Sequence, residues 1–436
     1  MKERAAQIFD LYANKLVQFS QQRGRQSWLV FLFILALILV SITPFPGHSE
    51  TSVGRNPNAA IVETCPQETS KELRGVWLTN VDSDVLFSRE KTKEAIADLA
   101  KLNFNTVYPT VWNWGYTLYP SPAAEKATGK ALDPTEGLQN RDLLKEIITA
   151  ARREEMAVIP WFEFGFMAPA DSELAKRHPQ WLTERLDGST IWWEGKVHQR
   201  VWLNPLHPEV QQFITDLLVE IVSNYDIDGI QVDDHFGYPS ELGYDELTVK
   251  LYQQEHNGQL PPEDSRDPDW IRWRADKITA YFETLFEAIK QANPNVIVSV
   301  SPNPQNFSLN SFLLDWHTWE RKGLIEELIV QIYRDRTDSF INELSQPELL
   351  AARENIPVGI GILSGLRGRP IFWNRIRQQV REARDRNFAG VSFFFYESLW
   401  NLGAESPERR QTALKSLLDK EAERPNLSDC RFSSTK

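Results

Sequence analysis

The sequence has fewer basic than acidic residues. Its 436 residues carry 48 Lys and Arg against 60 Asp and Glu, a formal net charge of −12. The first 27 residues hold five basic and two acidic side chains, so the rest of the chain carries −15. A body of this charge repels phosphate backbones, which argues against nucleic acid as a partner.

The chain also has little cysteine and no sign of a phosphate-binding or repeat architecture. Its 21 glycines form no Gly-rich phosphate-binding sequence after the first predicted strand, and no repeat of solenoid period is present. The two cysteines, Cys65 and Cys430, lie at the two ends of the part that we expect to fold. In an oxidising compartment such a pair predicts a disulfide between the ends of the domain, with two unpaired thiols as the alternative.

One long apolar run is present, close to the N-terminus. Residues 28–40 are all apolar, Arg23 and Arg25 precede them, and Pro44 follows. We interpret residues 1–27 as a cytoplasmic basic region, residues 28–42 as a signal peptide or an uncleaved membrane anchor, and residues 43–71 as a polar linker. Either form of the apolar segment directs the rest of the chain out of the cytoplasm. The sequence thus predicts an exported protein of the periplasm or cell envelope.

From residue 72 to residue 420, short β-branched or aromatic runs alternate with longer helical stretches, and a tail follows at residues 421–436. Eight such pairs predict an α/β fold of the (β/α)8 TIM-barrel type, with an open doubly wound sheet as the alternative. The predicted strands are 73–79, 106–110, 157–162, 229–233, 296–301, 328–332, 358–362 and 391–395. The predicted helices lie near 90–102, 141–155, 208–224, 270–292, 311–322, 338–354, 371–387 and 407–420.

The longest predicted connections follow the second, third and fourth strands. In TIM barrels the loops after the strands form the active site, so these three loops should surround a cleft. Flat aromatic rings pack on the apolar faces of sugars, although such rings can also simply cap the barrel. The chain has 15 Trp, and the aromatic residues that we place in these loops are Trp112, Trp114, Tyr116, Tyr119, Phe164, Phe166, Trp192, Trp193, Trp202, Phe236 and Tyr238.

Two adjacent acids end the fourth predicted strand. Because side chains alternate along a strand, Gln231 and Asp233 share one face, and Asp234 lies on the opposite face. The neighbours of Asp234 on that face are apolar and should pack on the surrounding helices. We therefore expect Asp233 over the barrel axis, whereas Asp234 braces a loop or caps it through backbone N–H groups.

Other carboxyl groups follow other strands: Glu163 after the third, Asp335 after the sixth and Glu397 after the eighth. Glycoside hydrolysis needs one protonated carboxyl, which donates to the leaving oxygen, and one ionised carboxylate, which attacks or activates water. Each of the three can partner Asp233, and each can instead be a structural ion-pair group. This chemistry needs no cofactor and no metal, so we predict neither.

Several segments resemble the glycosyl-hydrolase-like family 10 proteins over residues 72–420. They are ELRGVWLTNV (72–81), NTVYPTVWNWGYTLYP (105–120), AVIPWF (157–162), NPLHPEV (204–210) and, most specifically, YDIDGIQVDDHFGYP (225–239). The resemblance implies a TIM-barrel glycosidase, exported and acting on a polysaccharide, the glycan strands of peptidoglycan. It also implies a catalytic role for Asp233, two residues after the inward polar Gln231.

The sequence departs from that family pattern at Glu163, because many members carry Asn there. We therefore favour Glu397 over Glu163 as the proton donor, with Asp335 third, and place Asp233 and Asp234 beside it as catalytic candidates. The residues that we expect to bind the sugar are Trp77, Trp112, Trp114, Trp161, Trp192, Trp193, Gln231, His235, Tyr238, Asn303, Gln331, Tyr333 and Asp335.

Two rival functions remain open. Asp233, Asp234 and His235 in a row suggest a metal-dependent polysaccharide deacetylase, but no two of the seven His are spaced at i, i+4 to complete such a site. The other rival is a catalytically silent glycan-binding protein, which would keep the aromatic cleft without turnover.

Overall fold

The computed structural model describes residues 71–195 and 197–425. Within these residues no helix is long and apolar enough to cross a membrane. The apolar segment at 28–42, the linker up to residue 70 and both cysteines lie outside the described residues. The predictions made for them therefore stay predictions.

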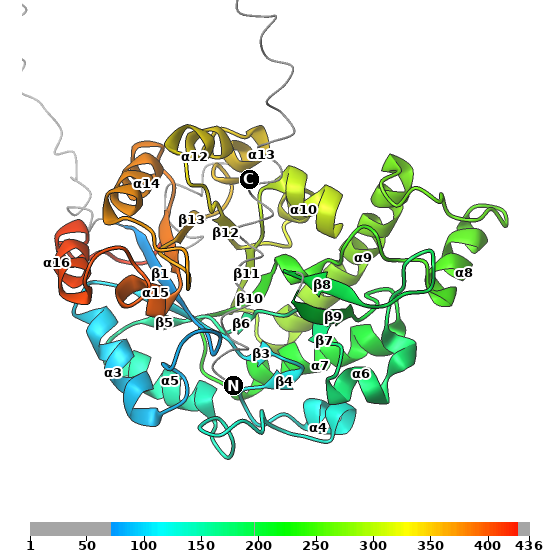
Figure 1. Cartoon of the computed structure of the whole chain (residues 1–436), viewed down its shortest axis with the longest axis horizontal. Helices are drawn as coiled ribbons and strands as arrows, with labels where there is room; N and C mark the ends of the chain where they lie inside the picture. Colours follow the sequence, from blue (N-terminus) through cyan, green and yellow to red (C-terminus); the bar gives the residue numbers. More distant parts are fainter. Residues whose placement is uncertain (1–70, 196, 426–436) are drawn as a thin grey trace, which may run out of the picture.

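A parallel sheet curls around the centre of the molecule (Figure 1). Its strands follow one another in the order β5-β2-β1-β14-β13-β12-β11-β10-β6. Apart from two very short strands, its members are β1 Leu73–Leu78, β2 Thr106–Pro109, β10 Gly229–Asp233, β11 Ile297–Ser301, β12 Glu327–Gln331, β13 Val358–Leu363 and β14 Gly390–Phe394. These seven agree with seven of the eight predicted strands to within one or two residues.

The eighth, predicted over 157–162, is divided into β5 Ala157–Val158 and β6 Trp161–Phe162. Pro160 lies between them, and proline has no N–H to donate to a sheet. β5 pairs with β2 and β6 pairs with β10, so the one segment occupies both ends of the strand order. The Ile159 N–H donates to the Val107 carbonyl at 3.0 Å, and the Pro160 carbonyl accepts from the Gln231 N–H at 2.8 Å. The sheet therefore closes into the predicted TIM barrel.

Helices surround the strands on the outside (Figure 1). Their apolar faces pack against the strands, as in α7, where Val210, Ile214, Leu217 and Ile221 are buried. These outer helices are α3 Arg89–Ala100, α5 Leu143–Arg153, α7 Pro208–Asn224, α9 Pro268–Ala292, α10 Gln305–Phe312, α11 Trp316–Arg321, α12 Thr337–Leu344, α13 Pro347–Ala352, α14 Trp373–Asp385, α15 Tyr396–Trp400 and α16 Pro407–Leu417.

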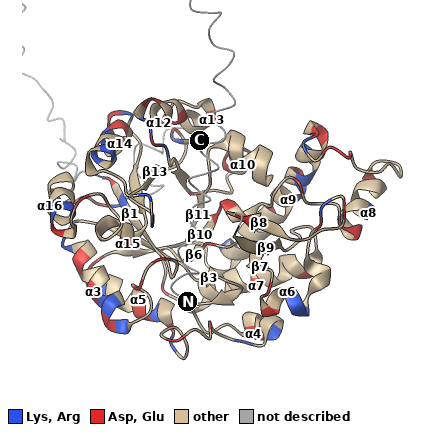
Figure 2. Cartoon of the chain, in the orientation of Figure 1, with Lys and Arg blue, Asp and Glu red and all other residues tan. Residues whose placement is uncertain are grey.

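Two predicted helices are interrupted. The prediction of one helix over 311–322 is wrong, because α10 ends at Phe312 and Leu313 adopts a left-handed backbone with φ 59° before α11 begins. The helix predicted over 338–354 is divided by Pro347, which cannot continue α12 but starts α13. Lys and Arg are interspersed with Asp and Glu along the outer helices (Figure 2).

The long loops after the second, third and fourth barrel strands carry further elements at the C-terminal end of the barrel. The loop after β6 forms an antiparallel sheet in the order β7-β9-β8. The elements of the three loops are β3 Trp112–Asn113, β4 Tyr116–Thr117, α4 Pro122–Thr128, β7 Met167–Pro169, α6 Glu173–Arg177, η1 Pro179–Trp181, β8 Trp192–Glu194, β9 His198–Trp202, η2 Asp234–Phe236 and α8 Glu246–Glu255.

The opposite end of the barrel is closed by the residues that follow α16. Glu423 bridges to Lys71 beside β1, and the Arg424 guanidinium donates to Glu327, a buried acid on β12. Glu327 also accepts from the hydroxyls of Tyr108 at 3.0 Å and Ser299 at 2.9 Å. Glu423 and Arg424 thus pack on this end of the barrel.

Candidate active site

Asp233 ends β10 and lies buried in the mouth of the barrel. Its Oδ2 accepts from the Trp161 indole N–H at 2.6 Å, and its Oδ1 accepts from the Asp234 backbone N–H at 2.5 Å and from the Gln331 amide at 3.3 Å. Burial, and then the charge of Asp234, raise the pKa of Asp233 well above its ordinary value. The Asp234 backbone N–H and the Trp161 indole N–H act against this rise, because N–H donors stabilise the ionised carboxylate.

Gln231 lies two residues before Asp233 on β10 and on the same face of the strand, as the alternation predicts. Its side-chain carbonyl accepts from the Trp77 indole at 2.8 Å, and its amide donates to Ser299 at 2.9 Å. Gln231 and Trp77 are thus core residues of the barrel, below the site rather than in its lining.

Asp234 points to the other side of the chain. Its Oδ2 accepts from the Asn303 amide at 2.5 Å, so Asn303, which we expected to bind sugar, instead braces Asp234. This agrees with the loop-bracing role expected for Asp234. The side chain is buried, and its charge acts on the neighbouring Asp233.

Glu163 follows β6 and is also buried. Its Oε2 accepts from the Thr79 hydroxyl at 2.9 Å and from the Asn113 amide at 2.6 Å. Burial raises the pKa of Glu163 to about 7, against the effect of these donors. A carboxyl with this pKa is half protonated near neutral pH, which is the property required of a general acid.

His235 lies between Glu163 and the adjacent acids Asp233 and Asp234. Its Nδ1 lies 2.8 Å from the Glu163 backbone carbonyl, which can only accept, so Nδ1 carries a proton. The same nitrogen is 3.5 Å from Asp234 Oδ1 and 3.8 Å from Asp233 Oδ1.

Potential metal-ligand atoms of Asp233, Asp234 and His235 lie within 4.8 Å of one another. With Nδ1 protonated, only Nε2 of His235 remains to bind a metal, and the group contains no second His of the kind that the deacetylase rival requires.

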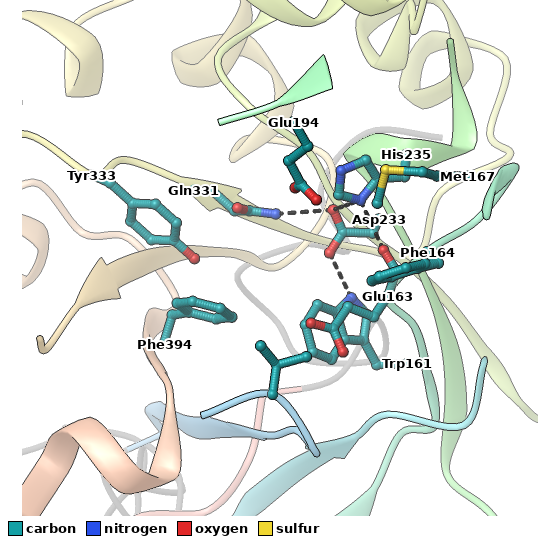
Figure 3. Close-up of a pocket in the computed structure, with 11 residues that line it drawn as sticks. Trp161, Glu163, Phe164, Met167, Glu194, Asp233, His235, Gln331, Tyr333 and Phe394 are labelled. Atoms are coloured by element: carbon teal, nitrogen blue, oxygen red, sulfur yellow. Dashed lines mark hydrogen bonds and ion pairs between the residues drawn. The ribbon is translucent and has the colours of Figure 1, made fainter. Parts of the chain in front are cut away.

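These residues surround one pocket (Figure 3). Tyr333 and Gln331 line it from the end of β12, and the Tyr333 hydroxyl is buried with no hydrogen-bond partner among the described residues. The full lining is Val81, Trp161, Glu163, Phe164, Met167, Glu194, Asp233, His235, Gln331, Tyr333 and Phe394. Aromatic walls with a few convergent polar groups suit a sugar ring.

Residues 72–380 match the family model described as glycosyl hydrolase-like 10. The chain belongs to this family. It is therefore a glycoside hydrolase, and the predicted family, fold class and enzyme class are confirmed.

Similar proteins agree with this membership. The chain is 27% identical over 347 residues to glycosyl hydrolase DigH of Escherichia coli K12, covering 69% of this chain and 74% of that protein. It is 25% identical over 256 residues to glycosyl hydrolase YngK of Bacillus subtilis, covering 54% of this chain and 46% of that one.

Solved structures show the same fold. The glycoside hydrolase domain of PgaB (BpsB) from Bordetella bronchiseptica matches with a TM-score of 0.54 at 11% identity, over 82% of this chain and 100% of that chain. The catalytic domain of β-amylase from Paenibacillus polymyxa matches with 0.57 at 10% identity, over 80% and 98%. At such identities the likeness concerns the fold alone.

Two of the predicted acids do not line the pocket of this family member. Asp335 forms ion pairs with Arg369 at 2.6 Å and Arg375 at 2.9 Å. Glu397, which we favoured as proton donor, lies at the start of α15, where it accepts from Ser83 at 3.3 Å and from Asn401. The structure therefore brings Glu163, and neither of these two, to the lining beside Asp233.

The aromatic residues predicted to bind sugar differ in burial. Trp161 lines the pocket, whereas Trp112 and Tyr238 are fully buried in the core. Trp192 is half-buried against Trp202. Trp114 is half-buried against Phe164, and Trp193 is 51% exposed.

The sequence interpretation missed Glu194 and Arg200. Glu194 lies on β8 and lines the pocket, and Arg200 on β9 donates to it at 2.8 Å. Both are buried. A signal was present: Glu194 follows Trp192 and Trp193, already assigned to the sugar, and strand alternation puts it on the same face as Trp192.

Proposed function

We propose that this protein is an exported glycosidase that hydrolyses the glycan strands of peptidoglycan. Asp233 acts as the ionised carboxylate, and Glu163 donates the proton to the leaving oxygen. The observation that carries the proposal is that both acids line one buried pocket, while N–H donors reach both oxygens of Asp233 and side-chain donors reach only Oε2 of Glu163.

That difference assigns the two roles. Asp233 is held by three N–H donors, which stabilise a negative charge and have no way to accept a proton. Within the described residues, Glu163 accepts side-chain hydrogen bonds from Thr79 and Asn113, and both end on Oε2. Oε1 is therefore the oxygen suited to carry the proton.

The substrate and the location rest on other support. The resemblance of residues 225–239 to family 10 implies cell-wall glycan, and the apolar run at 28–40 with its basic flank indicates export. The aromatic lining, with Trp161, Phe164, Tyr333 and Phe394, suits a polymer of hexose rings.

The test uses purified cell-wall glycan freed of peptides. Wild-type protein should release oligosaccharides that have gained one water and carry reducing ends, measured by mass spectrometry. Asp233→Asn should lose turnover by about a thousandfold or more, because it keeps the size of the side chain but removes the charge. Asp335→Asn is the matched control and should stay active. An active Asp233→Asn protein would remove the mechanism, and absence of turnover in the wild type would favour a glycan-binding protein.

A further inference from the structure

The pocket presents a third carboxyl, Glu194, that the proposed mechanism does not use. It comes from β8, in the excursion after β6, and lines the pocket together with Glu163 and Asp233. Figure 3 shows its carboxyl group directed towards Asp233 and the Gln331 amide. Among the described residues, the lining also holds one histidine, His235, and one tyrosine, Tyr333.

Arg200 forms an ion pair with Glu194 but lies outside the pocket lining, so a sugar in the pocket contacts the carboxylate and not the guanidinium. Its Nε donates to Glu194 Oε2 at 2.8 Å. The guanidinium lies over the Trp114 ring at 4.5 Å and near the Phe164 ring at 5.1 Å, and Arg200 is absent from the lining. The pair therefore presents its negative end to the pocket, and its positive end lies against the Trp114 and Phe164 rings outside the lining.

We propose that Glu194 is a specificity-determining residue that makes the pocket select a sugar without a carboxylate. Its Oε1, which makes no hydrogen bond within the described residues, accepts from hydroxyl or acylamino N–H groups of that sugar. The buried Tyr333 hydroxyl, also without a partner there, provides a second polar contact. A sugar carboxylate at this position would meet like charges in a buried site, where repulsion is poorly screened.

This inference rests on the proposed function and sharpens it. Peptidoglycan glycan alternates N-acetylglucosamine with N-acetylmuramic acid, and only the latter carries a lactyl carboxylate when the peptide is absent. The sugar whose anomeric carbon faces Asp233 is then N-acetylglucosamine. Hydrolysis should accordingly leave N-acetylglucosamine at the new reducing ends.

The first experiment identifies those ends. Products from peptide-free glycan are reduced with borohydride, and the reduced sugar is identified by mass spectrometry. N-acetylglucosaminitol is the expected product. Predominant reduced muramic acid would overturn the inference while leaving the proposed function intact.

The second experiment changes the charge. Glu194→Gln leaves Arg200 without its ion-pair partner beside the pocket. The ratio of new reducing ends that carry N-acetylmuramic acid to those that carry N-acetylglucosamine should then rise at least tenfold. Because an unpaired buried arginine can impair folding, the double variant Glu194→Gln with Arg200→Met removes both charges and should shift the ratio in the same direction by less. Glu241→Gln is the matched control, since Glu241 also pairs with an arginine, Arg185 at 2.7 Å, but does not line the pocket. An unchanged ratio in both Glu194 variants would reject the role of Glu194.

If the protein hydrolyses no glycan, the proposed function fails. The selectivity assigned to Glu194 is then tested by binding. Calorimetry then compares an N-acetylglucosamine tetramer with an alternating tetrasaccharide that ends in muramic acid. The wild type should bind the neutral tetramer at least tenfold more tightly, and Glu194→Gln should narrow the difference. Equal affinities in the wild type would overturn the inference.

Discussion

Removing the proton donor should stabilise the protein, and it should do so only at high pH. Burial raises the pKa of Glu163 from 4.5 to about 7 in the folded state. Between these two values the folded protein keeps the proton that the unfolded chain releases, so the free energy of unfolding falls as the pH rises. The full penalty is about 3 kcal/mol, since each pKa unit corresponds to about 1.4 kcal/mol.

Glu163→Gln keeps the shape of the side chain and removes the titration. Its free energy of unfolding, relative to wild type, should increase by about 2.5 kcal/mol between pH 5 and pH 8. Urea unfolding at both pH values, followed by circular dichroism, measures this difference. Other titrating groups cancel because they are present in both proteins.

Glu397→Gln is the control, because Glu397 is a carboxyl outside the pocket lining. Its side chain is only partly buried, so we expect no comparable stabilisation of this variant at pH 8. A constant difference for Glu163→Gln as well, or one that shrinks as the pH rises, would refute the argument that burial holds the proton on Glu163.

Three other predictions follow from the same geometry. The value of kcat/KM should fall as the pH rises through about 7, where Glu163 loses its proton, and a pH profile of wild type that stays flat to pH 9 would contradict this. Glu163→Gln should slow cleavage of natural glycan far more than that of aryl glycosides with good leaving groups, whereas Glu397→Gln should affect both little; steady-state kinetics on the two substrates compare them. Arg424→Met should destabilise the fold by about 3 kcal/mol, because it leaves Glu327 charged and unpaired in the barrel; Glu327→Gln in that background should recover most of the loss in urea unfolding.

The barrel could be predicted because its signals are local. Each strand is a short apolar run and each long helix has an apolar face, so periodicity alone located most of them. The failures were local as well. Pro160 lacks the N–H that would continue one strand, and the left-handed turn at Leu313 breaks a helix without a Gly or Pro to announce it. Propensity gives no warning of a leucine in that conformation, because the surrounding packing determines it.

The position of Asp233 could also be predicted, since alternation along β10 fixes the face on which it lies. The choice between Glu163 and Glu397 could not. Both acids follow a barrel strand, and what separates them is the direction in which the chain leaves the strand. Glu163 stays over the pocket within hydrogen-bond distance of Thr79 and Asn113, whereas Glu397 lies in the first turn of α15 and bonds to Asn401, the residue that caps the end of that helix.

Glu194 shows why the substrate-selecting part of such a site is harder to predict than its catalytic part. A barrel strand aims its terminal side chains at the axis, so topology constrains Asp233 and Glu163 before any loop is considered. Glu194 reaches the pocket only because β8 pairs with β9, and β9 with β7, in an excursion of the loop after β6. The orientation of Glu194 then depends on Arg200, which lies on the neighbouring strand β9. The position of Arg200 depends in turn on the rings of Trp114 and Phe164, which come from two different loops. Selectivity carried by such a hairpin can change by loop exchange while the two acids at the strand ends stay in place.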